Sequence, residues 1–73
     1  MSFNIPPYLR FSANGQRAIS QDPLMSNWWD CYGVTWEFPS GATYVAKLVD
    51  YGTADSLGRA EMWLAGQDVE LMT

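Results

Sequence analysis

The chain has 73 residues, 48% of them hydrophobic, and a net charge of −4, with one cysteine and no histidine. This length allows a single domain spanning residues 1–73, and the hydrophobic fraction is high enough for that domain to fold on its own. Without histidine there is no catalytic triad and no usual general base, and one cysteine cannot build a familiar zinc site. We therefore expect a protein that is not an enzyme and needs no metal or other cofactor.

The compartment follows from the same composition. Cys31 is the only cysteine, so no disulfide can form within the chain, and a reducing cytoplasm is expected. The neighbouring Asp30 should raise the pKa of this thiol, which favours a structural cysteine over a reactive one. The first seven residues lack the pattern of a signal peptide, and no stretch approaches the roughly 20 apolar residues of a membrane span. We expect no contact with a membrane.

The charge is unevenly distributed along the chain. Residues 1–36 are neutral overall, and the whole acidic excess lies in residues 37–73. Such a half repels phosphate and favours basic partners. Because the basic stripe typical of nucleic-acid-binding proteins is absent, we expect no direct binding to nucleic acid.

The first predicted element is a β-hairpin. Strands are expected near residues 8–13 and 16–20, on either side of Asn14-Gly15. This pair is typical of a two-residue type I′ turn, which needs positive φ at both central residues. Residues 21–31 break the pattern and are predicted to form a loop.

Within this loop, Asp22 and Pro23 could cap and open a single helical turn. The pair Trp28-Trp29 follows, and consecutive side chains in an extended segment point to opposite sides. Two interpretations are open. Either one tryptophan fills the core while the other anchors a partner, or both cap the ends of a small core.

Two further strands are predicted next. Residues 34–38 alternate between apolar and polar side chains, and a turn at 39–41 leads to a second strand at 43–50. Val34, Trp36 and Phe38 share one face of the first strand. In the second strand, Tyr44, Ala46 and Leu48 are expected to share the core face. Because Val45 and Val49 make the opposite face apolar too, we expect the second strand to be central and covered on both sides.

Gly52 is expected to end that strand, and a helix is predicted over residues 53–65 with Thr53 as its N-cap. The apolar stripe consists of Leu57, Ala60 and Leu64. Gly66 supplies the C-terminal stop. Gly58 costs up to about 1 kcal/mol relative to alanine inside a helix, which suggests a close approach to the sheet.

A short last strand at residues 69–71 completes the prediction. The order of elements indicates a small α+β domain, in which one helix packs on an antiparallel sheet of four to five strands.

The candidate partner-binding residues are aromatic or acidic, since tryptophan and tyrosine dominate interface energetics. Trp63 lies beside the apolar stripe, where it either extends the core or faces outward. Asp55 and Glu61 give the helix an acidic surface, although a solvated face with an Asp55–Arg59 pair explains the same charges. The candidate set is Trp28, Trp29, Tyr32, Asp55, Glu61 and Trp63.

The segment from Trp36 to Leu64 places a two-stranded hairpin before Ala54-Asp55-Ser56-Leu57, and Trp63-Leu64 closes the helix. In this order it resembles small bacteriophage anti-CRISPR proteins, especially a DNA-mimicking inhibitor of type I surveillance complexes. The resemblance implies a protein made during infection that blocks a bacterial CRISPR–Cas complex by occlusion, with a Cas subunit as its partner. It also implies that Asp55 and Glu61 stand where nucleic-acid phosphates would lie.

The chain departs from a strong DNA mimic, because it has eight acidic residues beside four Trp, four Tyr and three Phe. We therefore expect aromatic anchors to supply affinity and acids to supply steering. Two other functions stay open: a self-associating phage structural or assembly protein, and an adaptor-type inhibitor of another host enzyme. Both a monomer and a dimer agree with the sequence.

Overall fold

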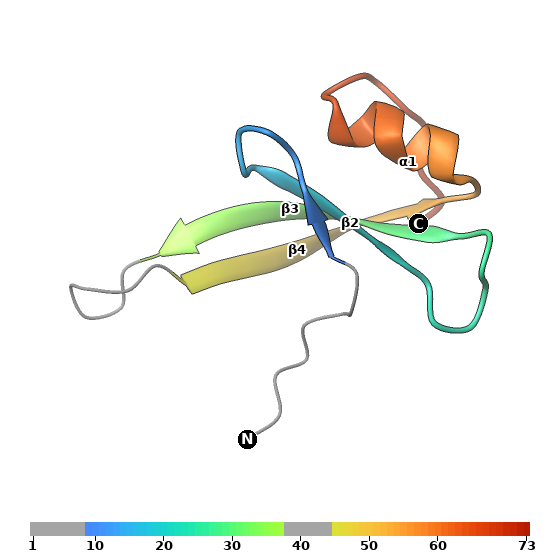
Figure 1. Ribbon diagram of the computed structural model, residues 1–73, viewed down its shortest axis with the longest axis horizontal. Coiled ribbons are helices and arrows are strands. Elements are labelled where there is room, and N and C mark those ends of the chain that lie inside the picture. The colour runs from blue at the N-terminus through green and yellow to red at the C-terminus, as the bar shows by residue number, and fades with distance from the viewer. Residues whose placement is uncertain (1–8, 38–44) are drawn as a thin grey trace.

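The computed structural model describes residues 9–37 and 45–73. The elements are the strands β1 (Arg10–Phe11), β2 (Arg17–Gln21), β3 (Trp29–Glu37) and β4 (Val45–Ala54), and the helix α1 (Leu57–Leu64). The strands form one antiparallel sheet in the order β1-β2-β3-β4, and α1 lies on one face of it (Figure 1). The expectations for Phe38, Tyr44 and the turn at 39–41 lie outside the described residues.

This arrangement confirms an α+β fold with one helix, and the described sheet has four strands. The additional strand predicted at residues 69–71 is not formed. Instead, the C-terminal segment makes a single antiparallel bridge between Met72 and Thr53. Val69 and Leu71 are half-buried and pack against the core.

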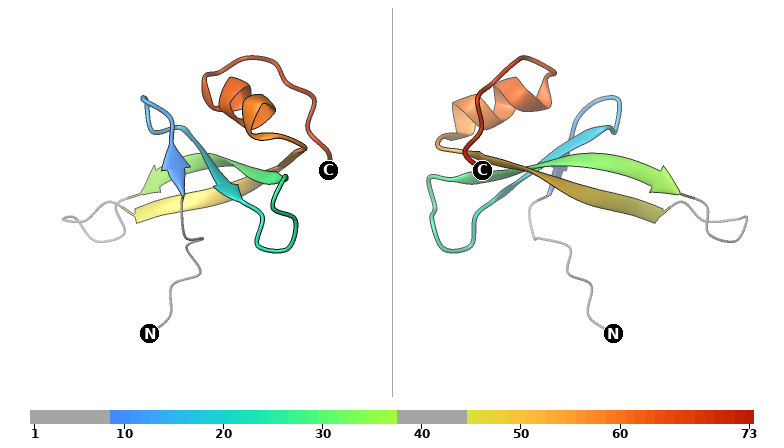
Figure 2. Two further views of the ribbon diagram at one scale, coloured as in Figure 1. Left: turned by 45° about the vertical axis from the view of Figure 1, so that its right-hand side comes forward. Right: turned by 180° about the vertical axis from the view of Figure 1, so that it is seen from behind.

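The helix covers only one end of the sheet. Beyond it, β3 and β4 continue as a two-stranded arm, formed by residues 34–37 and 45–48 (Figures 1 and 2). The core lies beneath the helix and consists of Ile19, Cys31, Ala54, Ala60 and Trp63. The prediction of a central, doubly covered strand at 43–50 is therefore wrong. β4 is the edge strand of the described sheet, and Val45 and Val49 are 45% and 48% exposed because the helix does not reach them.

The loop between β2 and β3 is shorter than predicted and spans residues 22–28. β3 already begins at Trp29, which pairs with Gln21 on one side and Ala54 on the other. Trp29 and Cys31 alternate onto the face that α1 covers, as a strand requires. Residues 29–31 form a strand and not a loop because they pair with β2 on one side and β4 on the other.

The turn between β1 and β2 differs from the predicted two-residue type. Ser12 and Arg17 close a four-residue connection, residues 13–16, through a bond of 2.8 Å from Ser12 N–H to Arg17 O. Gly15 adopts the expected positive φ, +71°, and donates to Ser12 O at 2.9 Å. Asn14 contributes through its side chain, whose Oδ1 accepts from Ser12 Oγ at 2.7 Å.

Gly52 does not end its strand but forms a β-bulge within it. It pairs with Cys31, while Asp50 pairs with Tyr32, so Tyr51 has no opposite residue in β3. The φ of Gly52 is +129°, a conformation that side chains other than glycine rarely adopt. The ring of Tyr51 lies on the helix side of the sheet, where it contacts the ring of Trp63.

The helix begins at Leu57, later than predicted. Ser56 is the N-cap, and its Oγ accepts from Arg59 N–H at 3.2 Å. Thr53 does not cap the helix because it still belongs to β4. Gly66 does supply the stop, with φ +92°. Its N–H donates to Trp63 O, and the N–H of Gln67 donates to Met62 O. These two hydrogen bonds form a Schellman motif.

The register of the helix decides which side chains are buried. Ala60 and Trp63 are buried, whereas Leu57 is 40% exposed. Trp63 therefore extends the core, which settles the alternative left open by its position beside the stripe. The rings of Trp63 and Tyr51 pack in a T-shaped arrangement with their centroids 5.8 Å apart, and the Arg17 guanidinium lies 4.6 Å from the centroid of the Trp63 ring.

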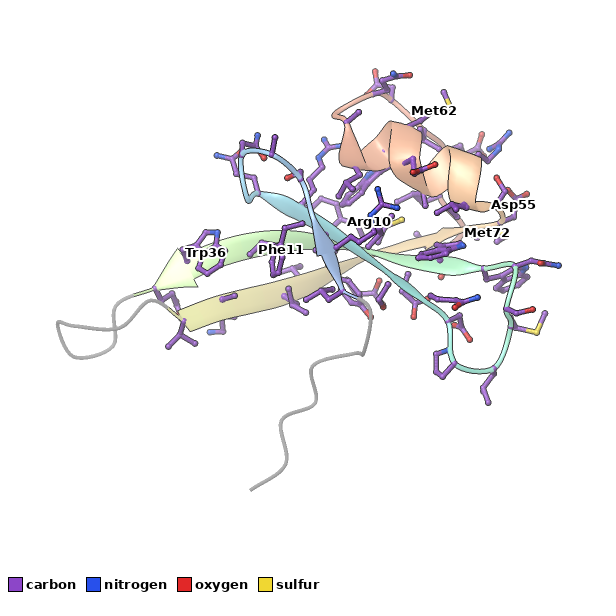
Figure 3. All side chains as sticks on the ribbon, in the orientation of Figure 1. Arg10, Phe11, Trp36, Asp55, Met62 and Met72 are labelled. Atoms are coloured by element: carbon purple, nitrogen blue, oxygen red, sulfur yellow. The ribbon has the colours of Figure 1, made fainter. Side chains whose placement is uncertain are left out.

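The opposite face of the sheet carries a second aromatic contact. Phe11 and Trp36 lie side by side, with ring centroids 5.9 Å apart (Figure 3). Trp36 Nε1–H also donates to Gly15 O at 2.9 Å, which ties the arm to the first turn. Val34 is buried on the same face as Trp36, as the alternation predicted, whereas Ala46, which pairs with Trp36, is exposed, so its assignment to the core was wrong.

Gly58 has no close neighbour. In the described part of the chain, no atom outside the helix's own backbone and the adjoining residues lies within 4 Å of where its Cβ would be. The predicted close approach to the sheet is therefore wrong. We expect Gly58→Ala to raise the free energy of unfolding by about 0.4–1 kcal/mol, because alanine restricts the unfolded chain. Urea denaturation followed by far-ultraviolet circular dichroism measures this gain, and a loss of stability would contradict it.

Candidate protein-binding surface

Hydrogen bonds at both ends hold the capped loop, residues 22–28. Asp22 Oδ1 accepts from the N–H groups of Leu24 and Met25 at 2.8 and 3.0 Å. Asp22 N–H donates to Trp28 O, and Trp28 N–H donates to Met25 O, both at 2.9 Å. The predicted helical turn is absent, but the capping chemistry predicted for Asp22 is present. These bonds fix the backbone of the loop from both ends.

The tip of the capped loop is apolar and faces solvent. Leu24 is 89% exposed and Met25 is 48% exposed. Gln21 adds a further brace, since its Nε2 donates to Ser26 O at 2.8 Å. Single exposed apolar residues are common on protein surfaces. Here two of them stand together on a hydrogen-bonded loop, so a partner could bind them with little loss of backbone entropy.

A hollow of about 370 Å³ lies beside the loop. Its lining residues are Ser26, Asn27, Trp29, Asp55, Ser56 and Leu57. They come from the capped loop, the start of β3 and the start of α1, which meet at the same end of the molecule (Figure 1). Trp29 and Leu57 give the hollow an apolar surface, and we call it the Trp29–Leu57 hollow.

The predicted aromatic residues are divided among different environments. Trp29 packs against the core and also lines the hollow. Trp28 is half-buried and braces the capped loop through its backbone. Tyr32 lies on the sheet face away from α1, where burial raises its pKa. Trp63 is only 5% exposed and is not accessible to a partner, which corrects its assignment as a surface residue.

Each of the two predicted acidic residues forms an ion pair. Asp55 lies 3.6 Å from Arg59 Nε, which confirms the expected pairing, and Glu61 lies 3.3 Å from Arg10 Nη1. Both pairs are about half-exposed, so each contributes little to stability. Figure 3 shows Asp55 at the start of the helix. Of the six candidates, only Trp29 and Asp55 are brought together in one hollow.

Sequence reasoning missed Leu24 and Met25. They belong to no periodic pattern, so nothing in the alternation of the chain marked them. A signal was nevertheless available, because Asp22-Pro23 is a capping pair and it is followed directly by two apolar residues. A capped turn with an apolar tip is the local pattern that would have identified them.

Among residues 9–37 and 45–73, no group of three or more His, Cys, Asp or Glu could hold a metal ion. No helix in that part of the chain combines the length and apolar character needed to span a membrane. Cys31 is fully buried, and burial, more than Asp30, raises its pKa to about 11. Its thiol is a core residue.

We expect Asp22→Ala to loosen the capped loop without unfolding the domain. The two N–H donors from Leu24 and Met25 lower the pKa of Asp22, so the carboxylate is the form that the fold favours. Its contribution is present above the ordinary pKa of 3.8 and is lost as pH falls through the lowered value. Hydrogen exchange at Leu24 and Met25 should accelerate several-fold in the variant. Asp22→Asn keeps an acceptor and should retain most of the protection, and equal exchange in wild type and Asp22→Ala would contradict the brace.

No protein-family model, no curated protein and no solved structure matches this chain. The capped loop and the Trp29–Leu57 hollow therefore carry the functional conclusion.

Proposed function

We propose that this chain acts by binding another protein and catalyses no reaction of its own. The observation that carries the proposal is the apolar tip, Leu24 and Met25, held by hydrogen bonds beside the Trp29–Leu57 hollow. A rigid apolar anchor next to an aromatic-lined hollow is the arrangement in which binding energy concentrates at interfaces. The loop supplies a side chain to the partner, and the hollow receives one from it.

The anchor is large enough to matter for affinity. Fully burying an exposed leucine side chain contributes about 1.5–3 kcal/mol, which corresponds to about 10-fold to 100-fold in the dissociation constant. Because Leu24 is 89% exposed in the free protein, nearly all of that gain is available on binding. Little is lost to ordering, since the backbone of the loop is already fixed.

The resemblance to anti-CRISPR proteins extends the proposal to a target. In this view the chain binds a bacterial CRISPR–Cas effector complex of type I in the host cytoplasm, and occludes target DNA binding or cleavage. Asp55 and Glu61 are each paired with an arginine, so phosphate mimicry would contribute less than apolar contact. The net charge of −4 would steer the chain toward a basic channel.

The test is a titration of purified, guide-loaded type I complex with the wild-type chain and with Leu24→Ser. Wild type should abolish target DNA binding or cleavage at stoichiometric amounts. Leu24→Ser should be about 10-fold to 100-fold weaker, since it removes the anchor and leaves the backbone bonds of the loop in place.

Met62→Ser is the matched control, because Met62 is also exposed, at 45%, but lies on the helix outside the proposed surface. It should inhibit like wild type. If the wild-type chain does not affect the complex, this target is ruled out. That result would also be expected if the chain inhibits another host enzyme. Inhibition that is equal for wild type and Leu24→Ser would rule out the surface.

A further inference from the structure

The outer side of β4 offers backbone groups to another strand. β4 is the edge of the described sheet, and among the described residues only Met72 pairs with that side, at Thr53. Residues 45–51 therefore form a free edge segment. In an edge strand, alternate residues direct N–H and C=O groups outward, and this row is a template for pairing with a further strand.

Apart from the bulge at Tyr51, this edge has few of the features that usually prevent pairing. β4 is ten residues long, contains no proline, and carries one lysine, Lys47, which lies 3.9 Å from Glu37. The exposed residues Val45, Val49 and Tyr51 are 45%, 48% and 53% accessible. These are β-branched and aromatic side chains, the types that pair best across strands.

We propose that a second copy of this chain pairs with β4, antiparallel, about a two-fold axis at Leu48. Leu48 is the midpoint of the free segment, so this register uses all of it. Val45 then lies opposite Tyr51 of the second copy, and Lys47 lies opposite Val49 of the second copy. Each β-branched and aromatic pair occurs twice, and the two four-stranded sheets become one continuous sheet.

Two features select this register. Moving the axis to Lys47 places two lysines directly opposite each other, which is unfavourable. Moving it to Val49 brings the second copy against Thr53, whose N–H and C=O are already bonded to Met72 at 2.7 and 2.9 Å. With Leu48 at the axis, no two like charges face each other.

The inference is independent of the proposed partner. The free segment lies mainly on the arm, while the capped loop lies at the helix end of the sheet (Figures 1 and 2). Each surface can therefore be disabled without the other. Loss of dimerisation would leave the partner proposal standing, and loss of partner binding would leave the dimer standing.

The first test is analytical ultracentrifugation of the full chain over a range of concentrations. Pairing over seven residues is a small interface, so we expect a reversible dimer with a dissociation constant in the micromolar range, roughly 1–100 μM. Val45→Lys combined with Val49→Lys should weaken it at least tenfold, since the lysine at position 49 faces Lys47 of the second copy. Met62→Lys, a substitution at an equally exposed residue on α1, should dimerise like wild type.

The second test fixes the register. Leu48→Cys places two thiols on the two-fold axis, so mild oxidation should yield a covalent dimer, with circular dichroism confirming the fold. Ala46→Cys faces Asp50 of the second copy and should cross-link far less, and wild type should not cross-link because Cys31 is buried. The proposal is overturned by a chain that stays monomeric up to about 1 mM, by lysine variants that dimerise like wild type, or by equal cross-linking at positions 46 and 48.

Discussion

Replacing Trp63 with alanine should leave most of the chain unfolded in the absence of denaturant. Trp63 is by far the largest residue of a core whose other members are Ile19, Cys31, Ala54 and Ala60. A buried tryptophan truncated to alanine typically costs about 3–5 kcal/mol. A single core in a chain of this size supplies only about 3–5 kcal/mol in total. The loss is therefore as large as the stability itself.

The Trp63→Ala variant also removes contacts that join the helix to the sheet. The edge-to-face contact with Tyr51 and the cation–π contact with Arg17 both depend on the indole ring. Far-ultraviolet circular dichroism and urea titration measure the outcome. Met62→Ala changes the neighbouring exposed residue and should shift stability by less than about 0.5 kcal/mol. A Trp63→Ala protein that unfolds cooperatively with a loss below about 1 kcal/mol would show that the core does not depend on this ring.

Gly52→Ala should be the next most damaging substitution. The φ of Gly52 is +129°, and its added Cβ would lie 2.7 Å from Met72 O and 3.0 Å from Leu71 Cβ. The conformation alone costs about 1–3 kcal/mol for a residue other than glycine. Because one clash is with backbone, the C-terminal segment must move as well, and the bonds between Thr53 and Met72 should be lost.

Gly66→Ala separates these two effects. Gly66 also has positive φ, +92°, but its Cβ would meet no atom of the described chain within 4 Å. It should therefore show the conformational cost without the clash. Urea denaturation should rank Gly52→Ala as the less stable variant, and hydrogen exchange at Thr53 and Met72 should accelerate only there. Equal stability of the two variants would contradict the claim that the C-terminal segment packs directly against Gly52.

Local signals in the sequence predicted several elements correctly. The Asn14-Gly15 pair marked a real turn, Gly66 ended the helix, and Asp22 capped its loop. Each of these depends on bonds within a few residues. The α+β class was predicted from the order of the strands and the helix along the chain. Such features are readable because their physical causes are short-range.

The incorrect predictions concern features that depend on contacts between residues far apart in the sequence. Val45 and Val49 suggested a doubly covered strand, but how far α1 extends over the sheet is not encoded in β4 itself. Gly52 read as a strand end because a bulge and a strand end look alike in one sequence. Thr53 was a plausible N-cap, and only its pairing within β4 moves the helix start to Leu57.

The candidate surface was predictable in part for the same reason. Trp29 and Asp55 do share a hollow. The ion pair of Glu61 was not predicted because its partner, Arg10, is 51 positions away in the sequence. Trp63 turned inward because the helix phase is set by its start. Leu24 and Met25 were missed because two adjacent apolar residues in a loop form no periodic pattern.

The two proposed surfaces would act together. A dimer formed along β4 carries two capped loops, each at the far end of its own sheet from the axis. A target with two matching sites, or two neighbouring targets, would then be bound with an avidity greater than that of one chain. Without dimerisation, the single capped loop would still bind, with its own affinity alone.

The central claim is that the chain binds a protein through the capped loop and the Trp29–Leu57 hollow. Its most direct test is hydrogen exchange of the chain, free and mixed with purified, guide-loaded type I complex. The account predicts slower exchange in residues 22–28 and at the start of α1, with the far end of the arm unchanged. Unchanged exchange at the loop and the hollow, or protection confined to other segments, would contradict it.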